Sequence, residues 1–94
     1  IAQVPIRNVC ARYGVSVFYN PENRTITLRK NDNTITLEVD SGYTIDNEGF
    51  ALPINPLTIV KGRAFINPYD IGLLLKLSEN QLIVDNDMVI FVVL

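Results

Sequence analysis

The chain has 94 residues, 48% hydrophobic and 19% charged, which is the composition of one globular domain and excludes a disordered segment. Eight basic and ten acidic residues give a net charge of −2, which argues against nucleic-acid binding through a basic face and against attachment to an anionic membrane. With no histidine and one cysteine, the chain cannot form an internal disulfide, an imidazole metal site, or a Ser–His or Cys–His catalytic pair.

The chain also lacks the apolar run of roughly 18–20 residues that a membrane-spanning helix needs, so we expect no membrane insertion. It begins at Ile1 without a methionine or a signal-like segment. We therefore expect a processed or excised piece of a longer protein. We expect residues 1–94 to form a single domain.

The first predicted element is a helix between Pro5 and Gly14, in "VPIRNVCARYG". Proline suits the first helical position and glycine the position just past the end. The apolar residues repeat at the i, i+3, i+4, i+7 spacing of a one-sided helix: Ile6, Val9, Cys10 and Tyr13. We expect Cys10 to act as a small core residue.

Arg7 does not fit this helix, because it places a cation in the first turn, where the helix dipole favours negative side chains. We therefore expect a tertiary partner for Arg7, either a carboxylate or strand-end carbonyls that a guanidinium can bridge. The prediction is a partly buried structural tether between the first helix and the sheet, with contact to a ligand as the alternative.

After Gly14 the pattern changes to period two, which predicts strands. Residues 15–19 and 25–30 flank the turn "NPEN" as a hairpin, and 34–39 follows "NDN" as a third antiparallel strand. Residues 43–46 and 50–53 straddle "NEG", which predicts a further short hairpin.

The second half of the chain repeats this alternation of strands and helix. Residues 57–60 and 64–67 flank the turn "KGR". The second helix lies in "NPYDIGLLLKL", with Asn67 as its N-cap, Pro68 at its first position and Asp70 in its first turn. Two closing strands meet at Asn86 and Asp87. The predicted fold class is α+β, a mostly antiparallel β-sheet with two short helices.

A two-copy repeat of helix plus hairpin is one further interpretation of this order. Aligning Pro5 with Pro68 places a short helix and then a hairpin after each proline, and sets Arg7 opposite Asp70. The match is one of pattern more than identity, so a fold without a repeat stays equally open.

Acidic residues gather at three predicted turns, 31–33, 46–49 and 85–87. None has the ligand spacing of an EF-hand loop, and Asn and Asp are common turn formers, so we expect solvated turns, with adventitious calcium as the alternative. Paired carboxylates could serve glycoside hydrolysis, but the candidates are scattered as in an ordinary surface. They are Glu22, Glu38, Asp40, Glu48 and Asp70. We expect no enzyme, no metal and no cofactor.

Two stretches, "VPIRNVCARYG" and "VSVFYNPENRTITL", resemble the copper amine oxidase N-terminal-like domain, often called a stalk domain, of bacterial cell-surface and secreted proteins. That pattern is V-P-hydrophobic-R, a short helix closing on glycine, a strand ending in an aromatic residue, a turn, and a T-hydrophobic-T strand. The matching positions are Val4, Pro5, Arg7, Gly14, Val17, Tyr19, Asn20, Thr25 and Thr27. Farther on, "TITLEV", "IDNEG" and "IVKGRAFINP" are similar to the family's middle strand, its small hairpin and the approach to its second helix.

The second helix departs from the family pattern, because Asp70 stands where the family has arginine and Leu77 where it has glycine. The resemblance implies a non-catalytic module, extracellular or at the bacterial cell surface, that spaces or docks neighbouring domains or surface proteins. Copper in amine oxidases is held by histidines, which this chain lacks.

The alternative hypothesis is a binding module for cell-wall glycan or another polysaccharide. Such modules expose aromatic side chains, and the candidates are Phe18, Tyr43 and the polar Asn47. Two aromatics exposed on one flat face would favour this hypothesis, and their burial would contradict it. Because many edges of the predicted fold are strands, we also expect that a homodimer can form through strand edges.

Overall fold

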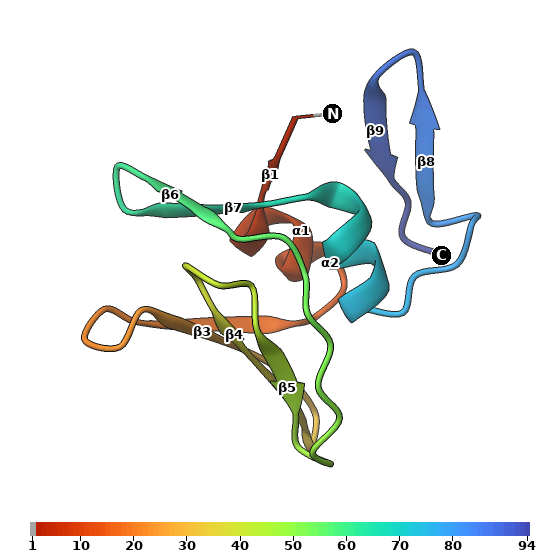
Figure 1. Cartoon of the computed structure of the whole chain (residues 1–94). Helices are drawn as coiled ribbons and strands as arrows, with labels where there is room; N and C mark the ends of the chain where they lie inside the picture. The colour runs from red at the N-terminus through yellow and green to blue at the C-terminus, as the bar shows by residue number, and fades with distance from the viewer. Residues whose placement is uncertain (1) are drawn as a thin grey trace.

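The computed structural model describes residues 2–94, in which two short helices and three antiparallel sheets share one core (Figure 1). The elements in chain order are β1 (Val4–Pro5), α1 (Ile6–Arg12), β2 (Ser16–Asn20), β3 (Thr25–Lys30), β4 (Asn33–Glu38), β5 (Thr44–Asp46), β6 (Thr58–Val60), β7 (Arg63–Ile66), α2 (Pro68–Leu74), β8 (Leu82–Asp85) and β9 (Met88–Phe91). The predicted α+β class with mostly antiparallel sheet is confirmed.

The helices lie over one face of the largest sheet, which has the order β2-β3-β4-β5 (Figure 1). A second sheet has the order β1-β7-β6, and β8 and β9 form a separate two-stranded sheet at the side of the molecule. The buried core draws on both halves of the chain, including Ile6, Cys10, Ile26, Leu37, Ile66 and Ile71. No helix among residues 2–94 combines the length and the apolar character needed to cross a membrane.

The first helix begins one residue later than predicted. Pro5 is its extended N-cap, with φ −68° and ψ 121°, instead of its first helical residue. The reason is tertiary, because Val4 and Pro5 pair with Ile66 and Phe65 of β7. The helix ends as expected before Gly14, whose φ of +71° lies in the left-handed region.

The second helix begins as predicted. The Asn67 side-chain oxygen accepts hydrogen bonds from the backbone N–H of Tyr69 at 2.8 Å and of Asp70 at 3.3 Å. Pro68 occupies the first helical position, where no N–H is needed. The helix ends at Leu74, three residues before the end of the predicted stretch.

The hairpins of β2 with β3 and of β8 with β9 are confirmed, and β4 is the third antiparallel strand. The predicted strand over 50–53 is wrong, since only Ala51 forms an isolated bridge, to Ile45 of β5. Two features shorten it: the Asp46 side chain holds the intervening turn by accepting from the N–H of Phe50 at 2.9 Å, and Pro53 has no N–H to donate.

The repeat stays a prediction. A strand, a helix and a hairpin follow one another twice, as β1-α1-β2-β3 and β7-α2-β8-β9, and β1 pairs antiparallel with β7. The two hairpins differ in their surroundings, however. The first joins a four-stranded sheet, whereas the second pairs only with itself within residues 2–94.

Candidate functional site

Arg7 contacts a strand carbonyl across from its helix. Its Nη1 donates a hydrogen bond to the backbone oxygen of Val17 in β2 at 3.0 Å. Arg7 itself is an exposed residue, where the sequence predicted a partly buried one. It lies on the solvent side of α1, opposite Ile6, Val9 and Cys10, and its long side chain reaches the strand along the surface. Whether this contact is its function stays a prediction.

Two further contacts from the end of α1 reach the C-terminal hairpin, and neither was predicted from the sequence. Arg12 Nη1 donates to the backbone oxygen of Phe91 at 3.2 Å. The Tyr13 hydroxyl donates to the backbone oxygen of Val92 at 2.8 Å. The residues on either side of these bonds are 79 positions apart in the chain, so no local pattern could have linked them. They attach β9 to the first helix.

The outer face of the largest sheet carries two of the nominated aromatics. Phe18 of β2 stands in a row with Thr27, Thr36 and Ile45, which are successive partners across the four strands. Phe18 is 57% exposed and Tyr43 is 43% exposed.

Tyr43 belongs to the neighbouring row on the same face. The N–H of Glu38 donates to the backbone oxygen of Tyr43 at 2.8 Å, which continues the β4–β5 register by one pair beyond Leu37 and Thr44. Successive side chains of a strand alternate between faces, and Thr44 is buried. Tyr43 therefore shares the solvent face with Phe18, at the opposite edge of the sheet.

Asn47 lies in the turn after β5, where its amide is bound to the backbone of β4. Its side-chain oxygen accepts from the N–H of Thr34 at 3.1 Å, and its own N–H donates to the Thr34 carbonyl at 3.0 Å. Asn47 also lines a groove on the core-facing side of the sheet. The amide oxygen of Asn47 therefore joins β4 to the turn after β5.

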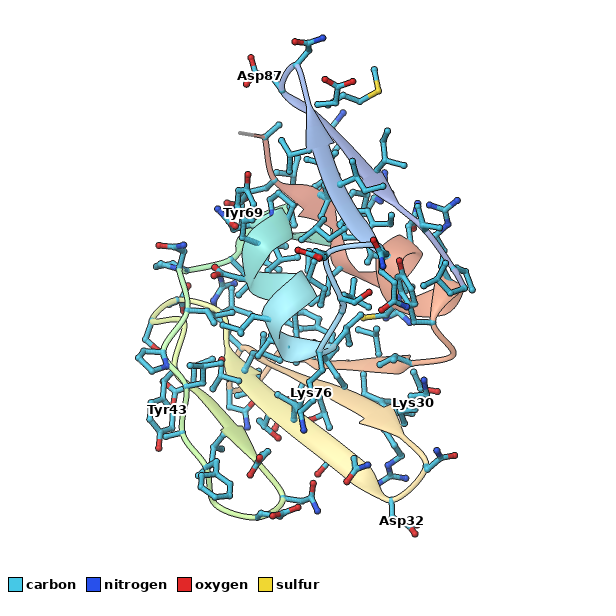
Figure 2. The ribbon with its side chains drawn as sticks, turned by 90° about the vertical axis from the view of Figure 1, so that its right-hand side faces the viewer. Lys30, Asp32, Tyr43, Tyr69, Lys76 and Asp87 are labelled. Atoms are coloured by element: carbon cyan, nitrogen blue, oxygen red, sulfur yellow. The ribbon has the colours of Figure 1, made fainter. Side chains whose placement is uncertain are left out.

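This groove has a volume of about 400 Å³ and lies between the β3–β4 strands and the end of α2. Its floor is apolar, with Leu28, Ile35 and Leu74, and its rim carries lysines and carboxylates. Lys30 and Lys76 lie on one side of the molecule in Figure 2. The remaining charged rim residues are Asp46 and Glu48. Both signs of charge are present, so the groove favours no single charge class of ligand.

Two of the carboxylates considered for catalysis, Asp40 and Asp70, bind groups in neighbouring loops. Asp40 accepts two bonds from Arg24, at 2.9 and 3.0 Å, and this guanidinium lowers the pKa of the Asp40 carboxyl. Asp70 accepts from the backbone and side-chain N–H groups of Asn55, each at 3.0 Å. A general acid in glycoside hydrolysis needs a raised carboxyl pKa, whereas the pKa of Asp40 is shifted the other way.

Cys10 is fully buried, and desolvation raises the pKa of its thiol to about 12, against a smaller lowering by Arg7. The thiol is therefore protonated and shielded at neutral pH. Within residues 2–94, no three residues of the types His, Cys, Asp and Glu come together as a metal site.

One comparison with known proteins gave a match. The model of the copper amine oxidase N-terminal domain family matches residues 2–72. The chain belongs to this family. Comparison with curated proteins and with solved structures found no match. The family match ends within α2, so the β8–β9 hairpin lies beyond the matched residues.

Copper does not fit the residues of this member of the family. Protein copper sites use imidazole, thiolate or thioether ligands. The chain has no histidine and one methionine, and its single thiol is buried and protonated, so the exposed thioether of Met88 is the one accessible donor of these kinds. The N-terminal domain of copper amine oxidases is a separate, non-catalytic domain, which agrees with this donor set.

Proposed function

We propose that this chain is a non-catalytic structural or interaction module of a bacterial cell-surface or secreted protein, which spaces or docks neighbouring domains. The observation that supports the proposal is the family match over residues 2–72, since this family's domain is separate from the catalytic part of amine oxidases. The polar side chains agree with it, because Asp40, Asp46 and Asp70 each accept hydrogen bonds that fix turns or loops.

An oxidase assay tests the non-catalytic part of the proposal. The purified chain, mixed with copper and a primary amine, is expected to release no more hydrogen peroxide than copper and the amine alone. Peroxide release that saturates with amine, and that disappears when the chain is unfolded, would contradict the proposal.

Amide NMR spectra test the docking part. Spectra of the module alone are compared with spectra of the module fused to the domain that adjoins it in a longer protein. We expect shifts that are confined to one exposed face of the module. Spectra that differ only at the point of fusion would contradict docking and leave a simple spacer.

A second candidate function is binding of cell-wall glycan or polysaccharide. The observation that favours it is the exposure of Phe18 and Tyr43 on one solvent-facing sheet surface. Aromatic rings bind the apolar faces of sugars, and the sheet holds these two side chains on one exposed face. Threonines from β3 and β4 lie between the two rings and offer hydroxyl groups for hydrogen bonds.

A pelleting assay with insoluble peptidoglycan and with plant and bacterial polysaccharides tests this second function. We expect co-sedimentation that falls when Phe18 or Tyr43 is changed to alanine. Tyr69→Ala is the matched control, because Tyr69 is 53% exposed but lies on α2, away from this face (Figure 2). No co-sedimentation, or an equal loss with Tyr69→Ala, would contradict glycan binding by this face.

A further inference from the structure

The β8–β9 hairpin has the composition of internal strands but stands at the side of the molecule. Cross-strand partners share a face, so Leu82, Val84, Val89 and Phe91 form one face, and Ile83, Ile90 and Met88 lie on the other with Asp85. The first face packs against the core through Phe91, Leu82 and Val89. On the second face, Ile83 is 40%, Ile90 41% and Met88 63% exposed. Strands that are apolar on both faces are typical of positions inside a sheet.

The backbone of β8 also has unused hydrogen-bonding groups. The N–H of Val92 donates to the carbonyl of Gln81 at 2.7 Å, so Gln81 and Val92 are a hydrogen-bonded pair of the β8–β9 ladder. Along an antiparallel strand, residues alternate between bonding to the partner strand and directing their backbone N–H and C=O away from it. Ile83 therefore bonds to β9, whereas the backbone groups of Leu82 and Val84 point away from β9. The Leu82 N–H donates to the backbone oxygen of Ser78 at 3.2 Å. The outward groups left at this edge are the Leu82 carbonyl and both groups of Val84.

Two other edges are hindered by arginines of α1. At the edge of β2, Arg7 donates to the Val17 carbonyl, and at β9, Arg12 donates to the Phe91 carbonyl. A guanidinium on an edge carbonyl occupies the acceptor that an added strand would need and places a charge beside it. Charged side chains at an edge are a common protection against strand addition.

The remaining edges are covered or short. The segment after β5 lies along it, with the Leu52 N–H donating to the Thr44 carbonyl at 2.8 Å. β1 has two residues and contains Pro5, and β6 has three residues. Among residues 2–94, β8 is therefore the edge that combines open backbone groups, apolar side chains and no covering segment. In Figure 1, β8 stands on the outer side of β9, away from the helices.

We propose that β8 is a dimerisation edge, at which two copies of this chain pair antiparallel about a twofold axis to form a sheet of order β9-β8-β8-β9. A second copy fits because the strand is complementary to itself. With Ile83 on the axis, Ile83 faces Ile83 of the second copy, Val84 faces Leu82 and Asp85 faces Gln81. The Val84 N–H of each copy then donates to the Leu82 carbonyl of the other, and no like charges stand opposite one another.

The dimer forms weakly, because such short strands bury less than the roughly 1,200 Å² of a stable, specific interface. Sedimentation velocity over a range of concentrations is therefore the primary measurement. The mass of the 94-residue chain is expected to rise with concentration from 10.6 kDa toward twice that value. A chain that stays monomeric at every concentration overturns the proposal.

Two lysine variants locate the edge. Ile83→Lys sets two like charges opposite each other on the twofold axis, and we expect it to raise the dissociation constant about tenfold or more. Ile90→Lys is the matched control, because Ile90 is directly opposite Ile83 within the hairpin and equally exposed, but lies on β9. Thermal unfolding of both variants verifies that the hairpin and core remain folded. An equal effect of the two lysines, or an effect of Ile90→Lys alone, overturns pairing through β8.

A charge-swap mixture then tests the register. Ile83→Lys and Ile83→Glu alone are each expected to dimerise more weakly than the original chain, whereas their equimolar mixture is expected to form a heterodimer, because opposite charges face each other on the axis. This rescue also separates dissociation from misfolding, since a misfolded hairpin would not recover on mixing. Failure to form the heterodimer overturns the proposed register.

Discussion

At the scale of single residues, the two arginines of α1 make the same kind of contact. Arg7 donates to a backbone carbonyl of β2, ten residues along the chain, and Arg12 donates to one of β9, 79 residues along the chain. The sequence showed that Arg7 is unfavourable for its helix dipole, and the structure shows which carbonyl it contacts. For Arg12 no such conflict existed, since a basic residue in the last turn suits the dipole.

Replacing Arg7 measures the strength of this contact. Arg7→Ala is expected to lower the free energy of unfolding by about 1 kcal/mol, the usual size for a partly exposed hydrogen bond, which for a domain of this size lowers the melting temperature by about 4–8 °C. Arg29→Ala is the control, because Arg29 is an exposed arginine of β3. A melting temperature that is the same for the two variants would refute the tether.

The Arg24–Asp40 ion pair predicts a pH dependence of stability. Arg24 lowers the pKa of Asp40 in the folded chain, so the stabilisation is fully present above the ordinary carboxyl pKa and is lost as the pH falls through the lowered value. Asp40→Asn should therefore be less stable than the original chain near neutral pH, and the difference should vanish in acid. Both side chains are exposed, so added salt should reduce the difference.

Thermal unfolding at a series of pH values measures this effect. The two chains should have converging melting temperatures as the pH is lowered below about 4. A difference that stays constant with pH would mean that Asp40 acts through packing or backbone geometry instead of through its charge.

At the scale of elements, the close approach of the turn after β4 to residue 54 depends on glycine. Gly42 has φ +76°, and an added Cβ would overlap the carbonyl oxygen of Ile54. The N–H of Ile54 donates to the Gly42 carbonyl at 2.9 Å. This contact carries the chain from β5 toward β6. Gly49 also has a positive φ, +87°, but its Cβ position is open.

These two glycines form a matched pair for mutation. Gly42→Ala should lower the free energy of unfolding by at least about 3 kcal/mol, since the left-handed backbone and the overlap both oppose it. Gly49→Ala should cost only about 1–2 kcal/mol, for the backbone alone. Denaturant unfolding measures both values. Equal losses would show that the turn moves away from Ile54 at little cost.

The elements themselves were predicted with uneven success, for physical reasons. The helix at 68–74 and the hairpin at 82–91 were predictable because an Asn-Pro cap and an Asn-Asp turn are local signals. The start of the first helix was misplaced because pairing with β7, which comes about sixty residues later, holds Pro5 extended. The strand predicted over 50–53 does not form, because the Asp46 side chain accepts from the N–H of Phe50 and holds the turn where strand pairing would begin.

At the scale of the whole molecule, the three sheets differ in how well they are supported. The four-stranded sheet buries Ile26 and Leu37 completely. The β8–β9 hairpin has one packed face and one exposed face, and a hairpin standing alone is marginally stable in water. We therefore expect the hairpin to open in a separate step, at lower free energy than the rest of the molecule.

Hydrogen exchange on the monomer, at low protein concentration, measures this difference. The ladder amides of Ile83 and Ile90 should exchange faster than the amides of the β3–β4 pair. As the concentration rises, pairing through β8 should slow exchange at Val84 first, because its N–H points outward. Uniform protection across all strands would show that the hairpin and the main sheet unfold together.

The sequence by itself determined the α+β class, the two helices, the principal hairpins and the family, because periodicity, capping and turn residues are local properties of the chain. Only the tertiary structure decided which residues come together. It placed Phe18 and Tyr43 on one face, bound the Asn47 amide oxygen to the N–H of Thr34, and placed the Val17 carbonyl within reach of Arg7. It also left β8 as an open edge, because which strand lacks a neighbour depends on the pairing of all the others.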